Sequence, residues 1–93
     1  MDKEIEKIKA VLSALAINLR EIQSIEDYRG QESELLKNME RSKTAINDIQ
    51  KNLESLKVKM PGTEDQKIIG LLLSKVNALQ IEADKILTRL TAA

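Results

Sequence analysis

The chain contains no cysteine, histidine, tryptophan or phenylalanine, and Tyr28 is its one aromatic residue. Without cysteine no disulfide can form, so we expect a protein of the cytosol or nucleus, and of these we favour the cytoplasm. Structural zinc requires thiolate or imidazole ligands, and a serine nucleophile requires an adjacent base, usually histidine. These absences argue against a zinc site and against serine or cysteine hydrolysis.

The remaining candidates for catalytic chemistry are weak. Two carboxylate pairs, Glu64–Asp65 and Glu82/Asp84, have polar neighbours and a spacing that puts them on solvated helix faces. A raised carboxyl pKa is therefore not expected for either pair. The glycines stand apart at positions 30, 62 and 70, so they form no phosphate-binding loop. We predict a protein that is not an enzyme and that uses no cofactor and no metal.

The charges of the chain are balanced along its whole length. Fifteen basic and fifteen acidic side chains cancel, and each third of the sequence is itself nearly neutral. A nucleic-acid partner is therefore not expected, because no segment is basic enough to neutralise phosphates. We also expect no membrane partner, since the N-terminus is charged throughout and no apolar run is long enough to cross a bilayer.

Apolar residues recur at alternating intervals of three and four, which indicates amphipathic helices with a heptad-like seam. The first seam consists of Ile5, Ile8, Leu12, Leu15, Leu19 and Ile22. The second consists of Leu35, Met39, Ser42, Ile46, Ile49, Leu53, Leu56 and Met60, and the third of Ile69, Leu72, Val76, Leu79, Ala83, Ile86 and Leu90. The pattern predicts three long helices and no strand.

Two breaks separate these helices, and they differ in strength. Proline ends a helix before it, so Pro61-Gly62 predicts a firm turn, and Thr63 with Gln66 predicts a capping box for the next helix. Gly30 suits a left-handed helix end after Arg29, with Ser33 as a cap for the second helix.

The Gly30 break has an alternative, because the second heptad phase also continues through it and a glycine inside a helix costs only about 1 kcal/mol. The first two helices then fuse into one rod, especially in a dimer formed by helix swapping. We favour the turn. The prediction is one all-α domain over residues 1–93, an antiparallel up-down-up three-helix bundle with helices at about 2–29, 33–60 and 64–91.

Residues 67–87 begin with an unusually apolar stretch, in which Ile68, Leu71 and Leu73 lie outside the seam. One interpretation is that this end is covered by both other helices near the Pro61 turn. The other is that it leaves an exposed apolar patch for another helix or a second copy.

One family pattern runs through most of the chain. Leu53-Glu54-Ser55-Leu56 precedes Met60-Pro61, and Leu72-Leu73-Ser74-Lys75-Val76-Asn77-Ala78-Leu79 comes after them, with Asp84 beyond. Upstream, NLREIQSIE and LLKNMERSKTAINDIQKNLESL continue the likeness. The chain resembles the BAG domain of the athanogene co-chaperones. The resemblance implies a three-helix fold whose second and third helices bind the ATPase domain of DnaK-type heat-shock chaperones.

In that family a polar patch on the second and third helices makes the contact. Its acidic positions fall here at Asn47 and Lys57, its basic pair at Ile69 and Gly70, and its glutamine at position 77. The residues nearest the family's contacts, which the resemblance implies as the partner-binding set, are Asp48, Glu54, Lys67, Lys75 and Asn77.

Two functions are consistent with these patterns as hypotheses. The first is a BAG-like co-chaperone that favours an open, nucleotide-releasing state of a DnaK-type chaperone. The second is a helical assembly subunit or coiled-coil adaptor, similar to small bundles of membrane-fusion, tethering or kinetochore complexes. In either case the partner is a protein. A homodimer by helix swapping is also expected, because Ser42 weakens the middle of the second seam and Gly30 is a soft hinge.

Overall fold

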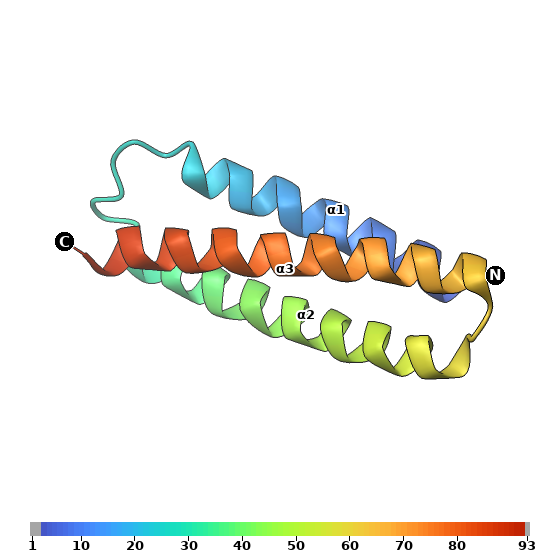
Figure 1. The fold of residues 1–93 in the computed structure, drawn as a ribbon. Coiled ribbons are helices and arrows are strands. Elements are labelled where there is room, and N and C mark those ends of the chain that lie inside the picture. Colours follow the sequence, from blue (N-terminus) through green and yellow to red (C-terminus); the bar gives the residue numbers. More distant parts are fainter. Residues whose placement is uncertain (1–2, 93) are drawn as a thin grey trace.

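A computed structural model describes residues 3–92, which form three helices and no strand (Figure 1). The helices are α1 (Lys3–Gln23), α2 (Glu32–Lys59) and α3 (Thr63–Thr91). α1 and α3 run in the same direction and α2 runs antiparallel to both, so the predicted all-α, up-down-up three-helix bundle is confirmed. The bundle is a rod of 49 × 20 × 17 Å.

The core of the bundle consists of the three predicted seams. Every residue of the α3 seam is buried, as are all of the α1 seam except Leu15 and the central five of the α2 seam. Leu15, Leu35, Leu56 and Met60 are half-buried and pack against the core. α2 and α3 form the most extensive helix pair, whereas α1 crosses them at an angle and touches each less (Figure 1).

A polar cluster interrupts the apolar core where α1 meets α2. Asn18 Nδ2 donates to Asn38 Oδ1 at 2.7 Å and to Ser42 Oγ at 3.1 Å, and Asn38 Nδ2 donates back to Asn18 Oδ1 at 3.3 Å. Ser42 Oγ also donates to Asn38 Oδ1 at 3.2 Å. Because these groups satisfy one another only in one alignment, the cluster fixes the register of α1 against α2.

The first helix is shorter than predicted. It ends at Gln23 instead of residue 29, and the predicted first residue, 2, lies outside the described residues. Asp27 Oδ1 accepts the backbone N–H of Arg29 at 3.0 Å, and Tyr28 O accepts that of Gln31 at 2.9 Å. Gly30 has a φ of +84°, as the third residue of a type II turn requires. A turn therefore separates α1 from α2, and the continuous rod is not formed.

Side chains from far along the sequence hold this loop in place. The Arg89 guanidinium lies 4.8 Å from the centre of the Tyr28 ring. Its two terminal nitrogens donate to the carbonyl oxygens of Gln23 at 3.3 Å and Ile25 at 3.4 Å. Tyr28 also packs against the core. Contacts to the end of α3 thus replace the last predicted turns of the first helix.

The predicted capping box at the start of α3 is wrong. Gly62 is the N-cap and no side chain caps the helix. Gln66 Nε2 instead donates to the carbonyl oxygens of Lys57 and Met60, each at 2.7 Å, where α2 ends. These carbonyls have no partner within their own helix, so Gln66 caps the C-terminus of α2 and not the N-terminus of α3. Ser33 likewise caps nothing, because Gln31 is the N-cap of α2.

The apolar stretch at the start of α3 is only partly covered. Ile68 and Leu73 are half-buried against the core, but Leu71 is 67% exposed, so the interpretation that both other helices cover this end is wrong for Leu71. Within residues 3–92, no helix combines the length and apolar content that crossing a membrane requires.

Candidate partner-binding surfaces

The outer edge between α2 and α3 is a row of polar contacts. Gln80 Nε2 donates to Gln50 Oε1 at 2.7 Å and to Asn47 Oδ1 at 3.4 Å. One helical turn further along α3, Lys43 Nζ lies 2.9 Å from Asp84 Oδ1. We call this row the α2–α3 polar edge. It joins α2 and α3, the two helices that pack most extensively against each other.

Two of the residues implied by the BAG resemblance lie on this edge. Glu54 comes one heptad after Asn47, and Asn77 comes three residues before Gln80, so each shares a helix face with a member of the edge. Both side chains are exposed. Their amide and carboxylate groups are available to a partner without any change in the fold.

The other three implied residues point elsewhere. Asp48 is exposed and lies four residues after Thr44, which places it on the outer face of α2. Lys67 shares the outer face of α3 with Leu71. Lys75 follows Leu71 by four residues, on the side of α3 away from Asn77, and lines a groove against α1. Glu54 and Asn77 therefore share one edge of the bundle, and the remaining three lie on other surfaces.

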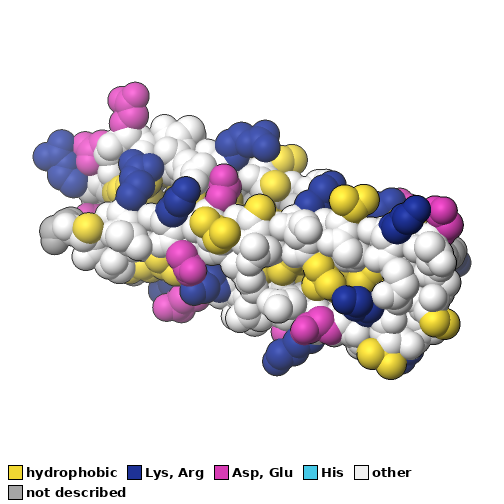
Figure 2. Space-filling model, in the orientation of Figure 1, with side chains coloured by type: hydrophobic (Ala, Val, Ile, Leu, Met, Phe, Trp, Pro, Cys, Tyr) yellow, Lys and Arg dark blue, Asp and Glu magenta, His cyan; other side chains and the backbone are white. Residues whose placement is uncertain are grey.

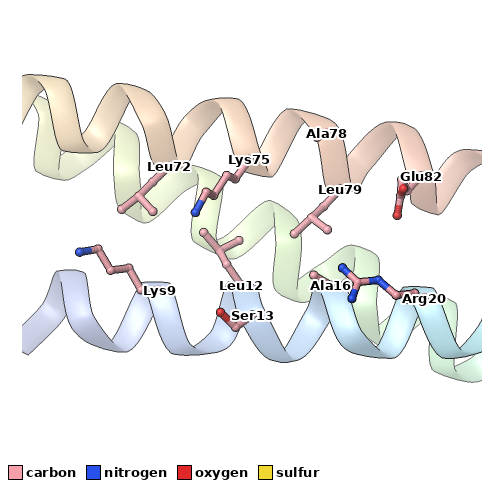
Figure 3. A pocket seen from close by; sticks show the side chains of 10 residues that line it. All are labelled: Lys9, Leu12, Ser13, Ala16, Arg20, Leu72, Lys75, Ala78, Leu79 and Glu82. Atoms are coloured by element: carbon pink, nitrogen blue, oxygen red, sulfur yellow. The ribbon is translucent and has the colours of Figure 1, made fainter.

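A groove lies between α1 and α3 (Figure 3). It has a volume of about 500 Å³ and is partly open to solvent. The buried side chains of Leu12, Leu72 and Leu79 form its floor. Its walls and rims are formed by Lys9, Ser13, Ala16 and Arg20 of α1 and by Lys75, Ala78 and Glu82 of α3.

The groove has a clear origin in residue size. Ser13, Ala16 and Ala78 stand next to the seam, at positions where a larger side chain would fill the space between α1 and α3. Short side chains there leave space above the floor leucines, although the leucines themselves are at most 8% exposed. The seam residues of α1 and α3 are still largely buried, but the packing beside them is incomplete.

Exposed apolar side chains continue along the groove. Of the large apolar residues, Val11 is 43% exposed, Ile17 54%, Val58 83%, Leu71 67% and Ile81 50%. Leu71 precedes Lys75 by four residues, and Ile17 lies four residues after Ser13, whereas Ile81 lies four residues after Asn77 on the outer face of α3. Helical spacing therefore sets Leu71 and Ile17 beside the groove. Figure 2 shows hydrophobic side chains on the α1–α3 face, with Lys and Arg side chains near them.

An exposed ion pair, Asp27–Arg29, lies in the turn before α2. The Arg29 guanidinium lowers the pKa of Asp27, to which it donates hydrogen bonds of 2.8 to 3.1 Å, and its backbone N–H lowers it further. Both groups are exposed in the turn before α2, away from the groove and the polar edge. No group of three potential metal-binding side chains occurs within residues 3–92.

Comparison with known proteins adds no relative. No family model, no curated protein and no solved structure matches the chain.

Proposed function

We propose that this chain is a non-enzymatic protein–protein interaction module that acts in the cytoplasm. The observation that carries this proposal is the α1–α3 groove, which has an apolar floor and, by helical spacing, the exposed side chains of Ile17 and Leu71 beside it. An apolar strip of this kind lowers its free energy when another chain covers it. A rigid helical rod with one open groove suits the capture of a further helix.

The first candidate role is that of a helical assembly subunit. A helix laid between α1 and α3 covers the exposed side chains of Ile17 and Leu71 and fills the space above the buried floor leucines. This completes a four-helix arrangement in which amphipathic helices bury their apolar faces against one another. The partner then supplies the packing that Ser13, Ala16 and Ala78 leave out.

The second candidate role is that of a BAG-like co-chaperone. Its support is the likeness of residues 53–90 to that family, together with the exposed Glu54 and Asn77 on the α2–α3 polar edge. In this role the edge binds the ATPase domain of a DnaK-type chaperone. Preference for the open conformer of that domain is sufficient to accelerate nucleotide release.

A titration with the purified ATPase domain of a DnaK-type chaperone tests the two roles against each other. Binding is measured with ATP, with ADP and without nucleotide, and nucleotide release is monitored with a fluorescent analogue. The informative variant combines Glu54→Lys with Asn77→Ala. Glu21→Lys, a charge reversal at an exposed position of α1 outside the edge, is the matched control.

The co-chaperone role requires wild type and the control to bind and to accelerate release, and the double variant to do neither. If wild type binds in none of the three nucleotide states, the co-chaperone role is removed and the assembly role remains. Binding that survives the double variant but is lost in Lys75→Glu places the chaperone in the α1–α3 groove instead of on the edge.

A further inference from the structure

We propose that the α1–α3 groove binds an amphipathic helix whose apolar stripe is flanked by acidic residues. The inference rests on the proposed function and deepens its assembly role by defining the chemistry of the partner. It does not depend on the α2–α3 polar edge, so a failed chaperone titration leaves it untouched.

The dimensions of the groove suit one helix face. Its lining runs from Lys9 to Arg20 on α1 and from Leu72 to Glu82 on α3. At 1.5 Å of rise per residue, each wall is about 15 Å long, which matches about three turns of a partner helix. Side chains at helical spacing on that partner, about three to four per two turns, reach the floor formed by Leu12, Leu72 and Leu79.

The openness of the groove favours a helix over a small molecule. Sites for small ligands typically enclose most of the ligand surface. This groove is partly open to solvent, and the large exposed side chains of Ile17 and Leu71 stand outside it. A small ligand on the floor leaves both in water. A helix about 10 Å wide covers the floor and reaches both rims.

The charges of the side chains that line the groove determine which charges are favourable beside the partner's apolar stripe. Lys9, Arg20 and Lys75 line the groove with one carboxylate, that of Glu82. This excess of cations stands out in a chain whose formal net charge is zero. Lys9 lies 3.6 Å from Glu6, but both side chains are largely exposed, and such a pair contributes little and exchanges readily with other partners.

The excess of positive charge is also concentrated at one end of the groove. Figure 3 shows Lys9 and Lys75 toward the end nearer Leu72, and Arg20 with Glu82 toward the other end. The opposite charges of Arg20 and Glu82 offset each other there. Carboxylates on the partner are therefore most favourable beside Lys9 and Lys75, because they place opposite charges together around a strip that binding removes from water.

The test is selection from a display library of helical peptides of about 18 residues, a length at which helices are less marginal than in shorter peptides. The library fixes an apolar stripe of Leu, Ile, Val and Ala at helical spacing. It randomises the flanking positions among Glu, Lys and Gln. We expect wild-type protein to enrich peptides with Glu at the flanks, and their affinities are then measured by titration calorimetry.

Two matched pairs of variants locate the site. Ala78→Leu fills the groove from an exposed position, and Ala14→Leu makes the same change on an exposed part of α1 outside the groove. Lys75→Glu reverses a rim charge, and Lys85→Glu reverses an exposed charge of α3 that does not line the groove. Circular dichroism is used to check that all four variants keep the wild-type helix content.

Ala78→Leu is expected to weaken the selected peptides about tenfold or more and Lys75→Glu about fivefold, while both controls bind as wild type does. Lys75→Glu should also shift the selection toward Lys at the flanks. Equal enrichment of Glu and Lys by wild type, no enrichment of any peptide, or unchanged binding by Ala78→Leu overturns the proposal. So does sedimentation of wild type as a dimer that Ala78→Leu converts to monomer, because a second copy then occupies the groove.

Discussion

Replacing glycine by alanine should change stability in opposite directions at Gly30 and Gly70. A Cβ added at either position meets no atom within 4 Å, so crowding contributes to neither change. Gly70 lies inside α3 with a helical backbone, where alanine is favoured over glycine by about 1 kcal/mol. Gly70→Ala should therefore stabilise the bundle by about that amount.

At Gly30 the sign reverses, because its φ is +84°. An L-residue there costs about 1–2 kcal/mol in left-handed strain, offset in part by the lower entropy of the unfolded chain. We expect Gly30→Ala to destabilise the protein by about 1 kcal/mol. Gly30→Asn should lose less, since asparagine tolerates that conformation better than alanine does.

Thermal unfolding monitored by circular dichroism separates these outcomes. For a domain of this size, 1 kcal/mol moves Tm by about 4–8 °C, so the two alanine variants should fall on either side of wild type. The double variant should show the sum of the two shifts, because the sites lie in different parts of the bundle. A Gly30→Ala protein as stable as wild type would refute the type II turn at Tyr28–Gln31.

Four further predictions address the core, the polar cluster, the loop and the groove. Leu53→Asp, at a fully buried seam position, should unfold the chain or cost more than about 4 kcal/mol in urea denaturation, and a stable helical protein would contradict the seam assignment. Asn18→Ala should cost about 1–2 kcal/mol in the same assay, because Asn38 and Ser42 lose a shared partner; an unchanged midpoint would mean that the cluster does not fix the register. The pKa of Asp27 is lowered in the folded state, so its small stabilising effect is present at neutral pH and lost as the pH falls through that lowered value. The Tm difference between wild type and Asp27→Asn should shrink accordingly in acid, and a difference that grows there would refute the Asp27–Arg29 contact. Lys75→Glu should leave the free energy of unfolding within about 0.5 kcal/mol of wild type, and a larger loss would show that Lys75 supports the fold instead of a partner.

The helices and the core could be predicted from the sequence because both depend on local spacing. Alternating intervals of three and four place the seam on one face whatever the chain does elsewhere. The single proline likewise breaks the pattern through its own backbone geometry. These features depend only on neighbouring residues in the sequence. The bounds of α2 and α3 therefore agree with the prediction to within one residue.

The end of α1 depends on residues that spacing does not connect. Ile25 and Tyr28 continue the heptad phase of the second seam, so the pattern there favours helix. In the structure Arg89, more than sixty residues away in sequence, donates to the loop carbonyls and lies over the Tyr28 ring, and spacing along the chain cannot indicate such contacts. Gln66 departs from its predicted role for a similar reason. A local rule pairs it with Thr63, but the unsatisfied carbonyls at the end of α2 lie within its reach.

The groove arises from the residues that flank the seam, and small residues there are a signal that the sequence does carry. Ser13, Ala16 and Ala78 can be taken for ordinary surface positions until the packing of α1 against α3 is known. Lys75 and Asn77 then separate, although only one residue stands between them. At about 100° per residue they point about 160° apart around α3, so one faces the groove and the other the α2–α3 polar edge. Substitutions at these two positions disturb nearly the same stretch of helix, and any difference in binding between them therefore reports which face of α3 a partner occupies.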